Sequence, residues 1–333
     1  MAIRHPYLMF LGDAPDQLAA KTASGVAHWR AEWCIGQLRL PGCRADLGLP
    51  DMTVGEAAGA GCKTLVVGVA NRGGVMPESW IGTLVEALNA GMDVASGLHD
   101  RLADNPAVTD AARHRGRALF DVRHPDRELP IGTGAKRPGK RLLTVGTDCS
   151  VGKMYAALAI ERELAARGVS TAFRATGQTG IFIAGDGISV DAVVADFISG
   201  AVELLSPASD PDHWDVIEGQ GSLMHPSYAG VTMGLLHGAQ PDALVLCHEP
   251  TRPHLRGLPG WPLPDLVECM EAHVAAARLT NPVARCVGVA LNAENLTDDR
   301  ERQAFLDQLE GELDLPVVDP VLTGVGPIVD TLL

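Results

Sequence analysis

A glycine-rich loop between an apolar strand and a helix limits the folds open to this chain of 333 residues. The loop, Gly146-Thr-Asp-Cys-Ser-Val-Gly-Lys153, follows the apolar run 141–145 and precedes a helical pattern over 152–167. Glycines let backbone N–H groups curl around phosphate oxygens, the helix start adds its positive dipole end, and Lys153 adds a point charge. We expect a ligand phosphate to contact Gly146, Thr147, Cys149, Ser150, Val151, Gly152, Lys153 and Met154.

The loop departs from the common phosphate-loop pattern at two positions. The pattern G-x-x-x-x-G-K-[ST] requires glycine at 147 and a hydroxyl at 154. Here the glycine stands one residue early, at Gly146, and Met154 replaces the hydroxyl. That hydroxyl normally ligates magnesium, so the sequence predicts an anion site that lacks one usual metal ligand.

Strands and helices alternate on both sides of a basic linker. Before it, 64–70 is predicted as a buried strand, 78–89 as a helix and 93–95 as a strand, a pattern typical of a Rossmann-like parallel sheet. Residues 121–141 are rich in Arg, Lys, His, Pro and Gly, which is typical of a domain boundary, although the segment could also be a basic flap over an anionic ligand. We therefore predict two α/β domains, 1–135 and 136–333.

The second predicted domain contains four further apolar runs that are predicted to form strands. Each run ends in polar or glycine residues, where a parallel sheet places its ligand-binding loops. The predicted strands are 171–174, 215–218, 243–247 and 287–291.

Composition narrows the class of partner. With 41 acidic against 27 basic residues, the formal charge of −14 disfavours binding to a nucleic acid backbone. No apolar run reaches the ~18 residues of a membrane span, and the first residues do not resemble a signal peptide. The seven scattered cysteines are expected to be reduced thiols. We expect a cytoplasmic protein, a homodimer in our prediction, that acts on small molecules.

Four motifs resemble dethiobiotin synthetase, in the same order along the chain. They are the phosphate loop, Phe173-Arg-Ala-Thr-Gly-Gln-Thr-Gly180, Asp215-Val-Ile-Glu-Gly-Gln-Gly221 and Gly288-Val-Ala-Leu-Asn292. The resemblance implies a P-loop fold for 141–333. It also implies that Gln178 and Gln220 lie on the substrate side and Asn292 on the base side of a bound nucleotide.

The whole chain is similar to the DgcN family. The segments that carry this resemblance are Tyr7-Leu-Met-Phe-Leu-Gly-Asp13, Val94-Ala-Ser-Gly-Leu-His99, the phosphate loop with its methionine, and Ile217-Glu-Gly-Gln-Gly-Ser-Leu-Met-His-Pro226. The resemblance implies a Rossmann-like N-terminal domain, a P-loop C-terminal domain, and transfer of an acetyl group from acetyl-CoA to the amine of D-glutamate.

The unusual loop agrees with this implied activity. Acetyl-CoA carries a diphosphate and a 3′-phosphate that a phosphate loop can bind, and acetyl transfer needs no metal at those phosphates. The alternative is an ATP-dependent ligase or kinase in which Asp148 and Glu218 hold Mg²⁺. A third hypothesis is a regulatory protein that binds a nucleotide without turnover.

Acetyl transfer to D-glutamate needs a base and a grip on two carboxylates. Glu218, which follows a predicted strand, is the favoured base, and Asp148 and His225 are the other candidates. A planar guanidinium matches a carboxylate with two hydrogen bonds, so arginines in loops are candidate clamps. The arginines proposed for the substrate are Arg174, Arg72 and Arg252.

Other polar groups around the loop have more than one candidate role. Backbone N–H groups of 177–180 or 219–221 are candidate oxyanion donors. The helix start favours a lowered pKa for Cys149, so an acetyl-cysteine intermediate stays open beside the simpler role of a small loop residue. The run 247–249 with His254 lacks the paired spacing of a zinc site, so no metal is predicted, and His248 is expected to border the ligand.

Overall fold

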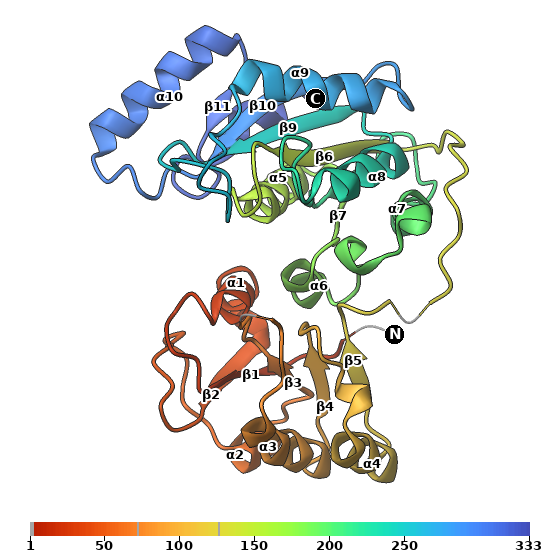
Figure 1. The fold of residues 1–333 in the computed structure, drawn as a ribbon, viewed down its shortest axis with the longest axis vertical. Coiled ribbons are helices and arrows are strands. Elements are labelled where there is room, and N and C mark those ends of the chain that lie inside the picture. The colour runs from red at the N-terminus through yellow and green to blue at the C-terminus, as the bar shows by residue number, and fades with distance from the viewer. Residues whose placement is uncertain (1–2, 72, 126) are drawn as a thin grey trace. The chain divides into compact units, whose positions relative to one another are not determined.

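The structure is a computed structural model that describes residues 3–71, 73–125 and 127–333. The chain forms two compact units (Figure 1). The first unit contains residues 1–127 and 177–192, and the second contains 128–176 and 193–333. Both units are built on parallel sheets, so the predicted class of two α/β domains is confirmed.

In the described part of the chain, the first unit has a five-stranded sheet in the order β2-β1-β3-β4-β5. Every neighbouring pair of these strands is parallel. The strands are β1 (Tyr7–Gly12), β2 (Cys34–Arg39), β3 (Thr64–Val67), β4 (Asp93–Ser96) and β5 (Leu119–Asp121). The helices are α1 (Lys21–Trp29), α2 (Val54–Gly59), α3 (Glu78–Asn89), α4 (Pro106–Arg115) and α6 (Gln178–Ala184), with 3-10 turns η1 (Ala31–Trp33), η2 (Leu102–Asp104) and η3 (Val190–Ala192).

Local sequence explains these elements. The central strands are fully buried and rich in β-branched and large apolar residues, as parallel strands covered on both faces require. At α4, the Asn105 side chain accepts from two backbone N–H groups, Pro106 occupies the first turn, and Gly116 ends the helix at a φ of +60°.

The segment 177–192 returns from the second half of the chain to complete the first unit. Its helix α6 packs beside α1 (Figure 1). The Tyr7 hydroxyl donates to the carbonyl of Phe182 at 3.3 Å, and Arg30 Nε donates to the carbonyl of Ile183 at 3.1 Å. The structure thus differs from a single cut between 135 and 136, because a helix that follows β7 in sequence packs with the first sheet.

In the described residues, the second unit has a six-stranded sheet in the order β11-β10-β9-β6-β8-β7, again parallel throughout. The strands are β6 (Lys140–Gly146), β7 (Thr171–Arg174), β8 (Trp214–Ile217), β9 (Ala243–His248), β10 (Arg285–Leu291) and β11 (Val317–Val318). The helices are α5 (Lys153–Ala166), α7 (Ile198–Leu205), α8 (Ala229–Ala239), α9 (Leu266–Arg278), α10 (Asp299–Leu313) and α11 (Gly326–Asp330), with the 3-10 turn η4 (Ala195–Phe197).

The strand order of the second sheet positions the phosphate loop. β6 lies between β8 and β9, and the loop leaves its carboxyl end to enter α5. Ligands of open parallel sheets bind outside the carboxyl ends of such strands, where the order of connection reverses. The predicted strands of this unit are confirmed, with Glu218 one residue beyond the end of β8. No helix among the described residues is long and apolar enough to cross a membrane.

Candidate functional site

The phosphate loop has a tight backbone that only its glycines permit at two points. A Cβ atom at Gly146 would lie 2.8 Å from the side chain of Val151 and 3.1 Å from Lys153 Nζ. Gly152 has a φ of +96°, and Ser150 has a φ of +55° that a non-glycine residue adopts only in a constrained turn. These positions curl the chain into a ring that ends at the first residue of α5.

The open end of α5 faces this ring. The first N–H groups of a helix have no intrahelical acceptor. At the start of α5 no side chain caps the helix at Gly152 in their place. Backbone N–H groups at a helix start and the positive end of the helix dipole together favour an anion. The loop residues that are predicted to contact a phosphate lie together at this helix start, and their binding role stays a prediction.

Lys153 is buried within the loop that it serves. Its ammonium donates to the backbone carbonyl of Asp148 at 2.7 Å, and its Cδ lies 3.0 Å from where a Cβ of Gly219 would be. Burial lowers the pKa of Lys153 from its ordinary value. The charge is therefore held at the centre of the ring, next to the N–H groups that would receive a phosphate.

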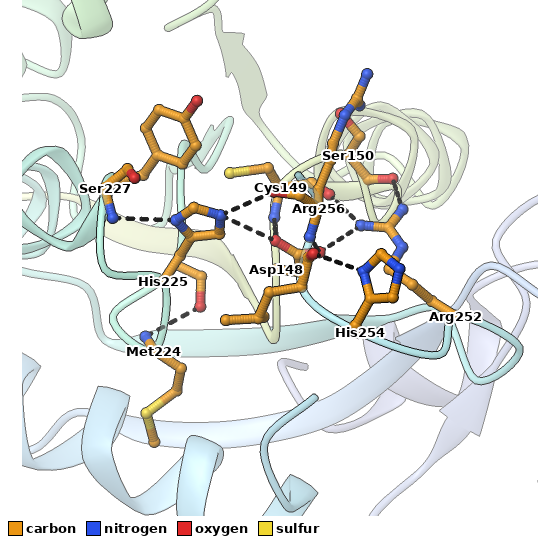
Figure 2. A network of polar contacts seen from close by, with 12 residues as sticks. Asp148, Cys149, Ser150, Met224, His225, Ser227, Arg252, His254 and Arg256 are labelled. Carbon is orange, nitrogen blue, oxygen red and sulfur yellow. Dashed lines mark hydrogen bonds and ion pairs between the residues drawn. The ribbon is translucent and has the colours of Figure 1, made fainter. Parts of the chain in front are cut away.

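The Asp148 carboxylate is fully buried and its oxygens bind other parts of the protein (Figure 2). Oδ1 accepts from the N–H of Cys149 at 2.6 Å. Oδ2 accepts from Arg252 Nη1 at 2.6 Å and from the N–H of Arg256 at 2.7 Å. This arrangement fastens the 249–256 segment, which follows β9, to the phosphate loop.

Arg252 braces the same loop from the other side. Its guanidinium also donates to the carbonyls of Cys149, at 2.7 Å, and Ser150, at 3.0 Å, and pairs with the Glu249 carboxylate. A guanidinium with these four acceptors has little capacity left for a substrate carboxylate. The predicted clamp Arg252 thus lies at the site but is engaged with the protein.

Arg256 is a cation that sequence reasoning missed. Its side chain is exposed, and Nη1 donates to the Ser150 hydroxyl within the phosphate loop (Figure 2). The only sequence signal was its place in a Pro- and Gly-rich segment after a strand, which does not indicate where the side chain goes. Its position makes it a second positive charge for a bound phosphate.

His225 has both ring nitrogens in use. The N–H of Ser227 donates to Nδ1 at 3.1 Å, so Nδ1 carries the lone pair and Nε2 carries the proton that faces the carbonyl of Arg256 at 3.2 Å. His225 therefore connects the turn after Gly221 to the 249–256 segment, and this bonding leaves no free lone pair to act as a base.

Three potential metal ligands lie together in this region. Ligand atoms of Asp148, Cys149 and His225 are all within 4.8 Å of one another. The donor set does not suit a cation, because Nε2 of His225 is protonated and Asp148 is already paired with Arg252.

The prediction of a lowered pKa for Cys149 is wrong, because burial of the half-buried thiol raises its pKa.

Glu218 and Gln220 meet at Thr176, beyond the ends of β7 and β8. Glu218 Oε2 accepts from the N–H of Thr176 at 2.9 Å, and the Thr176 hydroxyl donates to the Glu218 carbonyl at 2.6 Å. Gln220 Nε2 donates to the same hydroxyl at 3.2 Å. Gly219 is one of the predicted oxyanion donors. Its N–H already donates to the Thr144 hydroxyl at 3.0 Å.

The remaining predicted residues lie in different places. Asn292 lies beside the loop, with its Cβ 3.8 Å from where a Cβ of Gly152 would be. Arg174 Nε pairs with the buried Asp215 carboxylate at 2.7 Å, near the amino end of β8. Gln178 belongs to the first unit, where it packs on Gly97, and Arg72 lies outside the described residues.

Comparison with known proteins identifies the family. The model described as "Domain of unknown function (DUF1611_C) P-loop domain" matches residues 130–329, and the "DUF1611_N" Rossmann-like model matches residues 38–125. The chain belongs to the DUF1611 family. The DUF1611_N match lies within the first unit, and the DUF1611_C match lies in the second unit except for the segment 177–192, which belongs to the first.

Relatives of this DUF1611 chain match over its full length. A protein named D-glutamate N-acetyltransferase from Tritonibacter scottomollicae is 55% identical, with 99% of each chain covered. A second protein of that name, from Pseudoalteromonas sp, is 47% identical and is matched over 100% of each chain. The crystal structure of a DUF1611 family protein from Anabaena variabilis ATCC 29413 is 30% identical, with a TM-score of 0.87 and 99% of each chain covered. The predicted family resemblance is confirmed.

Proposed function

We propose that this DUF1611 protein is a D-glutamate N-acetyltransferase with acetyl-CoA as the acetyl donor. The observation that carries the proposal is the similarity to two proteins with that name, which extends over the whole chain at 55% and 47% identity. At that identity over both units, a shared reaction is the simplest account. The phosphate loop, with its open helix end, supplies a binding site for the donor.

The charges at the loop suit CoA phosphates without magnesium. The N–H groups at the start of α5, the ammonium of Lys153 and the guanidinium of Arg256 can share the negative charge of a phosphate. Met154 stands where a magnesium-binding hydroxyl would be, and the Asp148 carboxylate is paired with Arg252. These residues favour binding of a phosphate by the protein alone.

Acetyl transfer at this site needs one proton acceptor. The ammonium of D-glutamate loses a proton, and the resulting amine attacks the thioester carbonyl, forming a C–N bond and a tetrahedral oxyanion. Collapse of this intermediate breaks the C–S bond, and the CoA sulfur leaves as a thiol with the second proton that the attacking nitrogen releases. Glu218 is our proposed base, because its buried carboxylate lies at the carboxyl edge of the second sheet and is oriented by Thr176.

Substrate carboxylates need donors that the protein has not already engaged. Arg252 is occupied by the phosphate loop, and Arg174 is paired with Asp215. Gln220 is linked to Glu218 through Thr176, because its Nε2 donates to the Thr176 hydroxyl, which in turn donates to the Glu218 carbonyl. We assign Gln220 to the acceptor side of this site. A homodimeric state and a cytoplasmic location remain predictions of the sequence, whereas the names of the relatives support small-molecule substrates.

The decisive experiment is an assay of free thiol release. The purified protein is incubated with acetyl-CoA and D-glutamate, with and without EDTA, and L-glutamate serves as the matched control. We expect thiol release with D-glutamate that EDTA does not reduce, and mass spectrometry should detect N-acetylglutamate. The absence of thiol release with any D- or L-amino acid, together with magnesium-dependent consumption of ATP, would overturn the proposal.

A further inference from the structure

His248 is a buried histidine beside the phosphate loop that the acetyl-transfer chemistry above does not use. It is the last residue of β9, and its carbonyl accepts from the N–H of Asn292 at 2.8 Å. On the neighbouring strand, Gly146 pairs with Cys247, so His248 lies level with the first residue after Gly146. The imidazole therefore lies at the start of the loop.

One hydrogen bond fixes the proton on the His248 ring. Thr147 Oγ1 lies 2.9 Å from His248 Nδ1, and Thr147 is fully buried. Among the described residues this nitrogen is the only recorded partner of the hydroxyl. A buried hydroxyl left without an acceptor is destabilising, so the hydroxyl donates to Nδ1. Nδ1 then carries the lone pair, and Nε2 carries the proton.

The ring is uncharged under physiological conditions. Burial, with a further contribution from the positive charge of Arg252, lowers the pKa of His248 to about 4. The Glu249 carboxylate that follows His248 in sequence is itself paired with Arg252, so it does not offset this effect. His248 consequently offers a fixed N–H donor without a charge.

The Nε2–H group is also accessible. It has no hydrogen-bond partner within residues 3–71, 73–125 and 127–333, and His248 keeps 8% of its surface exposed. A rigid polar N–H that opens beside a phosphate loop matches the geometry of a ligand donor.

We propose that His248 is a ligand-binding residue whose Nε2–H donates to a phosphate oxygen of the donor held by the loop, with Thr147 as the positioning residue. The inference rests on the proposed function, which supplies acyl-CoA as the phosphate-bearing ligand. A neutral N–H donor orients the bound phosphate without adding positive charge to the site, whereas Lys153 and Arg256 supply that charge.

Nitrogen NMR on the full-length protein, labelled with ¹⁵N-histidine, tests the proton position. His248 is assigned by its loss in His248→Ala. We expect the Nε2–H form at pH 7 with no titration down to pH 5, and a selective shift of the Nε2 signal when CoA is added. The Nδ1–H form, an imidazolium at pH 7, or no shift with either CoA or pyrophosphate would overturn the proposal.

Calorimetric titration with CoA tests the contribution to binding. Loss of one hydrogen bond to a charged phosphate oxygen should weaken CoA binding by about 10- to 100-fold in His248→Ala. The exposed His114 on α4 provides the control, because His114→Ala should leave affinity unchanged. Thr147→Val should release the ring to a mixture of tautomers, whereas Thr147→Ser should retain the Nε2–H form. Unchanged affinity in a folded His248→Ala variant would overturn the proposal.

Two probes separate this proposal from the proposed function. A His248 shift caused by pyrophosphate but not by CoA would support His248 as a phosphate ligand and contradict acetyl-CoA as the donor. Thiol release in the assay above, together with a His248 signal that CoA and pyrophosphate leave unshifted, would support acetyl-CoA as the donor and contradict His248 as a phosphate ligand. If His248→Ala fails to fold, the wild-type spectrum still tests the tautomer, and assignment then relies on His248→Gln.

Discussion

Arg252 Nη1 lies 2.6 Å from Asp148 Oδ2, and this buried ion pair holds the 249–256 segment against the phosphate loop. Asp148 has no exposed surface and Arg252 very little, so neither charge is well hydrated. Burial of such a pair is tolerated because each charge is neutralised and its hydrogen bonds are satisfied. The pair therefore fixes the position of the 249–256 segment relative to the phosphate loop.

Removal of Arg252 should be costly. Arg252→Ala leaves the Asp148 carboxylate buried without its partner, and we expect the free energy of unfolding to fall by about 3 kcal/mol in urea titrations. Arg252→Lys should not restore it, because an ammonium cannot reproduce the forked contacts with the two loop carbonyls. The exposed pair of Arg113 and Asp110 is the control, and Arg113→Ala should change stability by less than about 1 kcal/mol. Equal effects of the two alanine variants would contradict this role.

Lys153 should contribute to CoA binding more than any exposed lysine of the second unit. A charge-assisted hydrogen bond is worth about 1.5–3 kcal/mol, so Lys153→Ala should raise the dissociation constant for CoA by about 10- to 100-fold. Lys136→Ala, at an exposed ion pair with Asp242, is the matched control and should have no effect. Calorimetry measures both variants, and an unchanged affinity for Lys153→Ala would count against the phosphate loop as the CoA site.

Cys149 should react slowly with alkylating agents. Only the thiolate is reactive, and burial raises the pKa of Cys149, so the reactive fraction at a given pH is smaller than for a free thiol. At pH 7 we expect slower reaction with iodoacetamide than for glutathione, with acceleration as the pH rises toward the raised pKa. Peptide mass spectrometry follows Cys149 against the urea-unfolded chain. Rapid alkylation of Cys149 at pH 7, or loss of turnover in Cys149→Ser, would revive the acetyl-cysteine intermediate.

Some features could be predicted because their residues are adjacent in the chain. The strand, the glycines and Lys153 of the phosphate loop occupy one continuous segment, so their order alone indicates the anion site. The apolar runs likewise predict β3 and β4 of the first sheet and β6 to β10 of the second, whereas β1, β2, β5 and β11 are not among the predicted strands. The charge partners of the loop come from distant positions. Arg252 and Arg256 reach Asp148 and Ser150 across about a hundred residues, and sequence spacing does not encode such contacts.

Other assignments needed tertiary information. Arg174 ends a strand before a glycine-containing loop, which favours a substrate contact, but the buried carboxylate of Asp215 on the next strand binds its guanidinium. Helix α6 has an ordinary apolar pattern, and such a pattern does not specify which sheet the helix covers. The structure places it in the first unit because its backbone carbonyls accept from Tyr7 and Arg30.

The first unit should depend on the segment 177–192. Residues 1–127 alone lack α6, whose Ile181, Phe182 and Ile183 side chains are buried in the complete protein. We expect this fragment to bind the dye ANS and to melt without a sharp transition, because apolar surface is left uncovered. Joining 177–192 through a flexible linker should restore cooperative melting, whereas a scrambled version of that segment should not. Cooperative unfolding of 1–127 without dye binding would show that the segment is dispensable.

Glu218 should affect turnover and not donor binding. Glu218→Gln keeps an oxygen that accepts from the N–H of Thr176, so the local fold is retained, but the amide cannot take a proton from the substrate ammonium. General base catalysis is worth about 10²- to 10⁴-fold, and we expect a decrease in kcat of that size with a CoA affinity within about twofold of wild type. Glu163→Gln, at an ion pair on the surface of α5, is the control and should retain normal turnover. The thiol-release assay gives kcat for both variants, and normal turnover in Glu218→Gln would remove Glu218 from the mechanism.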